Sequence, residues 1–90
     1  MRSIWKYSLE LKEGPHAFHI PYESDVLVTP HIAEQNGKIT LWCEVNTNRE
    51  PQEYVFHVFG TGWDVPSNVD YLGSVLMNQG AYVWHVYVER

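Results

Sequence analysis

Cysteine is almost absent from this sequence: Cys43 is the only one among 90 residues. A single cysteine excludes an intrachain disulfide and a zinc site built from several thiolates. Because a fold that needs no disulfide suits a reducing compartment, we expect the protein in the cytoplasm.

Basic residues are also scarce. The chain has six lysines and arginines against eleven acidic residues, which gives a formal net charge of −5. The six are scattered along the chain, whereas binding to a nucleic-acid backbone requires a clustered basic face that neutralises phosphates. We therefore expect no nucleic-acid partner.

Long apolar runs and helical periodicity are missing as well. No segment approaches the roughly 18 apolar residues of a membrane span. The N-terminal stretch MRSIWKYSLELKEG carries charges every few residues, unlike a signal peptide. We expect no membrane partner. Helical periodicity nowhere exceeds about two turns, which disfavours helices of ordinary length.

Aromatic residues and two-residue alternation are what the sequence does contain. Four Trp, six Tyr and three Phe suit β-strands and supply large apolar areas to a small core. Apolar and polar residues alternate along SIWKYSLELK (3–12) and KITLWCEVN (38–46), which predicts strands with one buried face. In the second segment the alternation turns Cys43 inward and Trp42 outward.

Turn signals separate the other strands. Asn36-Gly37 predicts a hairpin because both residues tolerate positive φ. Pro30 indicates an edge or a bulge, and Gly73 a bulge or a close backbone approach. The further extended segments are AFHI (17–20), DVLVTPHIAE (25–34), EYVFHVF (53–59), VDYLGSVLM (69–77) and AYVWHVYVE (81–89). The sequence therefore predicts one all-β domain over residues 1–90, a small antiparallel sandwich or partly open barrel of six to seven short strands.

Two segments resemble each other within the chain. VFHVF (55–59) and VWHVY (83–87) share the order Val, aromatic, His, Val, aromatic. One interpretation is that two central strands have independently reached the same composition. The other is that the two strands pair, which would place His57 and His85 on one face.

The sequence offers no arrangement of residues that indicates catalysis. Its five histidines have neither the HxH nor the HxxxH spacing of paired metal ligands, so we expect no metal site. No serine lies in a nucleophile motif, and an inward Cys43 in apolar surroundings is an inert thiol. We therefore expect a protein that is not an enzyme and needs no cofactor.

The segment Gly60-Thr61-Gly62-Trp63 follows a strand that is apolar on both faces. Two glycines allow backbone N–H groups to face a ligand, Thr61 offers a hydroxyl, and Trp63 offers a ring for stacking. No helix, lysine or phosphate-loop motif follows. The segment is therefore either a ligand loop or a plain turn with Trp63 folded onto the core.

Trp42 is the second candidate for a binding surface. Its indole lies on the polar face of its strand, between Thr40 and Glu44. An exposed indole there indicates a contact surface. A second sheet or a loop that covers it is the equal alternative.

The motifs SIWKYSL, LWCEV, FHVFGTG and YLGSVLMNQGAYVWHVY, in this order and over most of the chain, resemble a family of small uncharacterised proteins of bacteriophages and prophages. The motifs are structural rather than catalytic. The family has His after Gly-Thr-Gly where this chain has Trp63, so any function of that His does not carry over.

This resemblance implies a viral accessory protein that acts in the cytoplasm of a host cell. The function we expect is counter-defence, in which a small nucleotide signal is sequestered without catalysis in a pocket between protomers. Arg2, Lys6 or Arg49 would bind a pyrophosphate, and Trp and Tyr side chains would stack on bases. The alternatives are an inhibitor that binds a host protein directly and an enzyme that degrades the signal. Open strand edges favour a homo-oligomer, a dimer or higher.

Overall fold

Strands supply the regular secondary structure of the described chain. The computed structural model describes residues 1–11, 14–24 and 29–90. Its seven strands are β1 (Arg2–Leu9), β2 (His16–Ile20), β3 (His31–Gln35), β4 (Lys38–Asn46), β5 (Gln52–Gly60), β6 (Val69–Met77) and β7 (Tyr82–Glu89). Across these residues no helix is long and apolar enough to cross a membrane.

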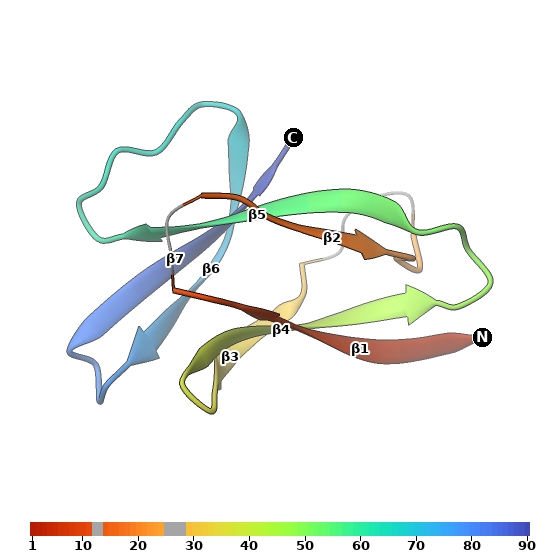
Figure 1. The fold of residues 1–90 in the computed structure, drawn as a ribbon, viewed down its shortest axis with the longest axis horizontal. Coiled ribbons are helices and arrows are strands. Elements are labelled where there is room, and N and C mark those ends of the chain that lie inside the picture. Colours follow the sequence, from red (N-terminus) through yellow and green to blue (C-terminus); the bar gives the residue numbers. More distant parts are fainter. Residues whose placement is uncertain (12–13, 25–28) are drawn as a thin grey trace.

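Two antiparallel sheets face each other. One has the strand order β1-β4-β3 and the other the order β2-β5-β7-β6. In Figure 1, β2 and β5 lie over β1 and β4, while β6 and β7 cross the view diagonally. Within the described residues the sheets do not close into a barrel. The predicted all-β fold of six to seven strands is confirmed, as a sandwich.

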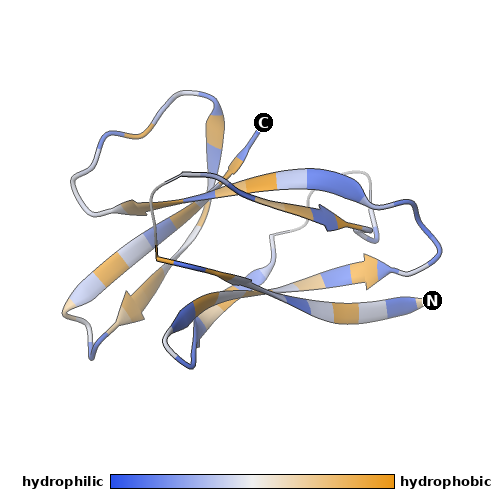
Figure 2. Cartoon of the chain, viewed as in Figure 1, coloured by the Kyte–Doolittle hydropathy of each residue, from blue (hydrophilic) through white to orange (hydrophobic). Residues whose placement is uncertain are grey.

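Alternation along the strands sends one set of side chains into the space between the sheets, and Figure 2 shows it as alternating apolar and polar bands. On β4 the residues Ile39, Leu41, Cys43 and Val45 are fully buried. Trp42 faces outward, as predicted. Each fully buried large apolar side chain stabilises the fold by about 1.5–3 kcal/mol. The four-stranded sheet closes this core with Ile20, Phe56, Val58, Val75, Val86 and Val88.

Strands β3 and β4 form the predicted hairpin. Asn36 and Gly37 have φ angles of 54° and 79°, as a type I′ turn requires. Several strand ends differ from the predicted bounds by one residue, and two differ by more. Strand β3 begins directly after Pro30, which has no N–H to donate to a ladder, and residues 25–28 of the predicted segment lie outside the described residues. Strand β1 ends at Leu9, and residue 12 also lies outside the described residues.

The two segments of similar sequence are neighbours. Strands β5 and β7 pair at the centre of the four-stranded sheet, with His57 opposite Tyr87 and His85 opposite Phe59. Residues directly opposite each other share a face. The two histidines therefore lie on the outer face of this sheet, separated diagonally by the Phe59–Tyr87 pair. The structure thus shows the pairing, and the shared face of the two histidines, that the second interpretation predicted.

A short crossover, Pro21 to Glu23, ties the two sheets together beyond the end of β2. The N–H of Asn46 donates to the Pro21 carbonyl at 2.8 Å, and the N–H of Glu23 donates to the Glu44 carbonyl at 3.3 Å. Between them the Tyr22 hydroxyl donates to Cys43 Sγ at 3.3 Å inside the core. Burial raises the pKa of both the Tyr22 hydroxyl and the Cys43 thiol.

Candidate ligand-binding site

The Gly60–Trp63 segment is a β-turn that closes the end of β5. The N–H of Trp63 donates to the Gly60 carbonyl at 3.1 Å. Gly62 has a φ of 86°, and Thr61 has a negative φ. This is the pattern of a type II turn, which requires a residue that tolerates positive φ at its third position. The local hydrogen bond explains why the chain reverses here without a helix.

Trp63 folds back over this turn but stays out of the core. Its ring and that of Trp84 are T-shaped, with centroids 5.9 Å apart. A Cβ at Gly60 would lie only 2.8 Å from Cε2 of Trp63, so the indole packs directly on the glycine. Trp63 nevertheless remains 48% exposed. The segment is thus a turn, as one interpretation held, and the indole is still available to a ligand.

A cavity of about 220 Å³ lies against this turn. Phe59, Trp63 and Tyr87 line it, together with Thr61 and His85. A cavity with apolar walls and a few polar groups is the usual form of a small-molecule site. Its volume is below the usual range of about 300–1,000 Å³, so it admits one small ring system rather than a whole drug-sized ligand. A second hollow of about 300 Å³ shares Gly60, Thr61 and Trp63 and continues toward Trp84.

An aromatic row crosses the outer face of the four-stranded sheet beside the cavity. His57 stacks on Phe59, with centroids 6.0 Å apart and planes 12° apart. Phe59 meets Tyr87 edge-on at 5.3 Å, and Tyr87 meets Tyr71 at 5.4 Å. Such pairs contribute about 0.5–1.5 kcal/mol beyond their buried area. The row fixes the two rings, Phe59 and Tyr87, that also line the cavity.

A chain of hydrogen bonds runs from the aromatic row to the turn. The Tyr71 hydroxyl lies 2.6 Å from Ser74 Oγ, which lies 2.7 Å from Nδ1 of His85. Nε2 of His85 lies 2.8 Å from Oγ1 of Thr61. Because both ring nitrogens are engaged, the imidazole is held in one orientation beside the cavity. The chain therefore positions the Thr61 hydroxyl and the His85 ring together.

A β-bulge makes this chain possible. Strict alternation would place Tyr71 and Ser74 on opposite faces of β6. The register shifts between Tyr71 and Gly73, so that Tyr71 is opposite Tyr87 and Ser74 is opposite His85. Bulges commonly re-aim side chains in this way. The predicted irregularity at Gly73 is confirmed, and a Cβ there would also lie 3.3 Å from Cδ1 of Ile32 on the other sheet.

The charged side chains on this sheet form ion pairs with one another, away from the cavity. Nε2 of His57 lies 2.6 Å from a Glu89 oxygen at the far end of the row. Arg90 pairs with Asp70 at 2.8 Å and donates to the Ser67 carbonyl at 3.0 Å. Among the residues that the structure describes, no lysine or arginine lines either hollow beside the turn. The site therefore suits a neutral planar group better than a phosphate.

The structure does not bring the other two predicted residues to this site. Arg2 and Trp42 lie on the outer face of the three-stranded sheet. Arg2 pairs with Glu44 at 3.1 Å. Trp42 is partly covered by the His31 ring, with centroids 5.6 Å apart. The predicted set is thus split between two sheets, with Gly60, Thr61, Gly62 and Trp63 together at the cavity.

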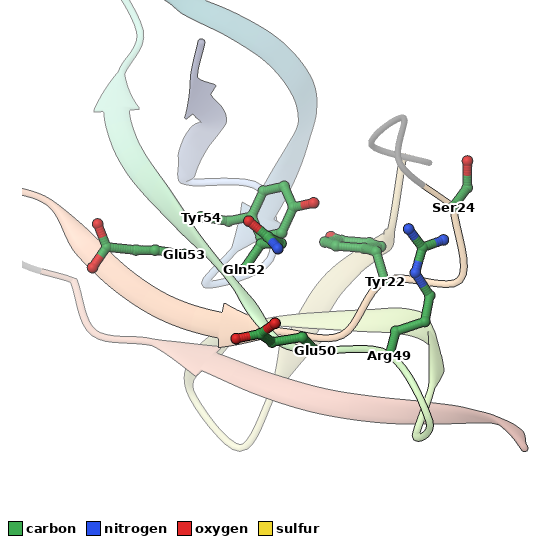
Figure 3. A pocket seen from close by; sticks show the side chains of 7 residues that line it. All are labelled: Tyr22, Ser24, Arg49, Glu50, Gln52, Glu53 and Tyr54. Atoms are coloured by element: carbon green, nitrogen blue, oxygen red, sulfur yellow. The ribbon is translucent and has the colours of Figure 1, made fainter.

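A larger hollow of about 550 Å³ lies near the crossover (Figure 3). Arg49 is the cation that lines it, and its guanidinium donates to the Glu23 carbonyl at 2.7 Å. The carboxylates of Glu50 and Glu53 line the same hollow. Two acidic groups oppose a phosphate there, and Tyr22 is only 3% exposed and so has no free ring face for stacking. This hollow is a poorer candidate for the expected nucleotide.

Sequence reasoning did not find Tyr71, Ser74 and His85 as a group. Ser74 has no motif around it, and its contact with His85 depends on the β6–β7 register and on the bulge. The similarity of 55–59 to 83–87 was the one usable signal, because pairing of these segments puts His85 beside the end of β5. His16, by contrast, is buried, with Nε2 3.0 Å from the Glu10 carbonyl. Within the described ranges no three His, Cys, Asp or Glu side chains are grouped to hold a metal ion.

Comparison with known proteins gives a family and no characterised relative. The model of a family described as a domain of unknown function, DUF7352, matches residues 1–90. No curated protein shows significant sequence similarity to the chain. No solved structure matches it significantly either. The chain belongs to the DUF7352 family.

Proposed function

We propose, for this member of a family of unknown function, a role in binding rather than catalysis. Its ligand is a small molecule with a planar ring, such as the base of a nucleotide signal. The observation that carries the proposal is the cavity lined by Phe59, Trp63 and Tyr87, together with Thr61 and His85. Stacking of one base on an aromatic ring contributes about 1–3 kcal/mol. The Thr61 hydroxyl, which His85 holds in place, would orient the edge of the base.

The hydrogen bonds of His85 support binding over nucleophilic catalysis. A serine nucleophile needs a base that a third group, usually a carboxylate, orients. Here the second nitrogen of His85 meets the Thr61 hydroxyl, and Ser74 is shared with Tyr71. Such a chain orients side chains without supplying the negative charge that would stabilise an imidazolium.

The setting that we propose is sequestration of a host nucleotide signal by a bacteriophage protein in the host cytoplasm. The resemblance to phage and prophage proteins is its support. Unlike the expected pocket between protomers, this cavity is formed by one chain, and no lysine or arginine of the described residues lines it. On this proposal the base enters the cavity and the phosphates stay in solvent.

Calorimetry with a panel of nucleosides and their mono- and diphosphates tests this function. We expect binding that depends on the base and changes less than about threefold when phosphates are added, since no lysine or arginine of the described residues lines the cavity. Trp63→Ala should weaken binding at least tenfold and leave thermal stability nearly unchanged, because the indole is half exposed. Trp42→Ala is the matched control, on the other sheet, and should bind normally. Absence of binding at millimolar concentrations, or equal losses in both variants, would contradict the proposal.

Direct binding to a host protein is the second candidate function. It is favoured by large exposed apolar side chains on and around the β6–β7 edge: Tyr71 is 57% exposed, Leu76 64% and Tyr82 57%. Exposed apolar surface of this kind is typical of contact sites. A pull-down that recovers one stoichiometric host protein, and loses it with Leu76→Lys, would favour this function. Retention of the partner by that variant would argue against it.

A further inference from the structure

In the part of the chain that the structure describes, strand β1 is the least protected of the four sheet edges. Strand β2 lies between Pro15 and Pro21, β3 follows Pro30, and β6 contains the bulge between Tyr71 and Gly73. Strands β2 and β3 are also only five residues long. Short strands, prolines and bulges are the usual means of preventing edge-to-edge pairing. Strand β1 has eight residues and none of these features.

The two cations of β1 do not guard its edge. Charged side chains protect an edge when they extend over it. The Lys6 amine instead donates to Gln35 Oε1 on β3 at 3.0 Å, so the side chain reaches back across β4. Arg2 likewise turns toward Glu44 on β4 at 3.1 Å. Both charges are drawn away from the open side of the strand.

The open side of β1 presents regularly spaced backbone groups. The Met1 carbonyl accepts a hydrogen bond from the Thr47 N–H at 2.9 Å. This bond determines which residues of β1 point their backbone N–H and C=O groups toward β4. In an antiparallel pair, alternate residues point their N–H and C=O groups toward the neighbour, and those between them point away. The residues that point away from β4 are Arg2, Ile4, Lys6 and Ser8.

Apolar side chains accompany this edge on both faces. Trp5 lies opposite the buried Cys43 and thus on the inward face, yet it is 42% exposed, because the other sheet does not cover it. Ile4, on the outward face, is 68% exposed. An indole half exposed beside a buried core is expected to gain from a partner that covers it.

We propose that β1 pairs with β1 of a second copy of this chain, antiparallel and with Trp5 on the two-fold axis. The inward side chains of the two strands lie on the same face of the joined sheet only if odd-numbered residues stand opposite odd-numbered residues and even-numbered opposite even-numbered. With Trp5 on the axis, Ile4 stands opposite the partner's Lys6, and Arg2 stands opposite the partner's Ser8. The residues that point away from β4 then form the hydrogen-bonded pairs, and the two indoles cover each other.

The neighbouring registers are disfavoured by charge. An axis at Ile4 places Arg2 opposite the partner's Lys6, and an axis at Lys6 places two lysines directly opposite each other. Like charges in such pairs are destabilising. The register centred on Trp5 avoids both. This dimer uses the three-stranded sheet and is independent of the proposed function, whose cavity lies on the other sheet.

Charge variants at Trp5 test this register. Analytical ultracentrifugation should show a concentration-dependent dimer for the wild-type chain. Trp5→Lys and Trp5→Glu should each raise the dimer dissociation constant at least tenfold, because position 5 meets itself. An equimolar mixture of the two should recover the dimer. Trp42→Lys, on the same sheet but away from the edge, should dimerise as the wild type does.

Several results would overturn the proposal. The first is a wild-type chain that stays monomeric up to millimolar concentration. The second is a dimer that persists in both Trp5 variants. The third is a mixture of the two variants that fails to associate although circular dichroism shows both of them folded. Oxidative crosslinking provides a second measurement. In a Cys43→Ala background, which removes the thiol opposite position 5, Trp5→Cys should form a disulfide-linked dimer, whereas Ser3→Cys should not, because Ser3 stands opposite the partner's Tyr7. Equal crosslinking of the two would also contradict the register.

Discussion

Ser74 Oγ lies 2.7 Å from Nδ1 of His85 across the β6–β7 pair, and the bulge beside Gly73 is what also brings Tyr71 to that face. The extra residue, Leu72, has no partner in the ladder. It turns inward, where it packs against the core. One added residue thus converts a regular edge strand into a support for His85 beside the cavity.

We predict that Ser74 is not an activated nucleophile. Its hydroxyl is shared between Tyr71 and His85, and the second nitrogen of His85 meets a hydroxyl rather than a carboxylate. A fluorophosphonate probe should therefore label the protein no faster than it labels Ser74→Ala. Rapid labelling that is lost in Ser74→Ala and in His85→Ala would show that the pair is reactive and would contradict the binding role.

Gly60→Ala should displace the Trp63 indole. The new Cβ would lie 2.8 Å from Cε2 of that ring, too close for any ordinary contact, while φ at Gly60 is not positive and permits alanine. The Trp63–Trp84 pair should then lose its exciton signal in circular dichroism. In a Trp63→Ala background the same change at Gly60 should have no such effect, and persistence of the signal in Gly60→Ala would contradict the contact.

Gly73→Ala should be coupled to Ile32. The added Cβ would lie 3.3 Å from Cδ1 of Ile32, so the side chain must move. Ile32→Val removes that carbon atom. In a double-mutant cycle we expect Gly73→Ala to be about 1 kcal/mol less unfavourable in the Ile32→Val background, as measured by chemical denaturation. If the changes in unfolding free energy of the two substitutions were strictly additive, Gly73 and Ile32 would not be in contact between the sheets.

Stability should fall at alkaline pH because of Tyr22 and Cys43. Burial raises the pKa of the Cys43 thiol above its ordinary 9.0 and that of Tyr22 above its ordinary 10.0. The unfolded chain therefore releases these protons at lower pH than the folded chain does. Stability should be unaffected by these groups below about pH 8 and should decline above pH 9, by up to about 1.4 kcal/mol per pH unit for each group.

Denaturation curves from pH 7 to 10.5 measure this decline, at fixed ionic strength. Cys43→Ala should make the decline less steep between pH 9 and 10, because the thiol proton that the folded chain retains is gone. Thiol reagents should fail to react with Cys43 in the folded protein at neutral pH, since the side chain is fully buried. An unchanged slope in Cys43→Ala would contradict the assignment.

Alternation and turn chemistry carried most of the fold prediction. The strand 38–46 was predicted with its observed bounds, as was 69–77, because both have clear apolar faces and turn residues at their ends. The inward and outward sides of β4 followed from the same period. Strand β3 begins at His31, directly after Pro30, which cannot donate to a ladder, and residues 25–28 of the predicted segment lie outside the described residues.

The candidate site was only partly predictable. The Gly60–Trp63 turn is a contiguous motif and could be selected from its residues. Arg2 and Trp42 were grouped with it on residue type alone, and only the sheet order shows that they lie elsewhere. Tyr71, Ser74 and His85 required the register of β6 against β7, which depends on long-range packing and on a bulge whose exact position no local pattern specifies.

The crossover at Pro21–Glu23 makes the two sheets one cooperative unit. Strand β2 is bonded to β5, and its direct continuation is bonded to β4 of the other sheet. Neither sheet can therefore open fully while the other keeps this segment in place. The slowest amide protons of β4 and β5 should exchange with deuterium at a common free energy, that of global unfolding.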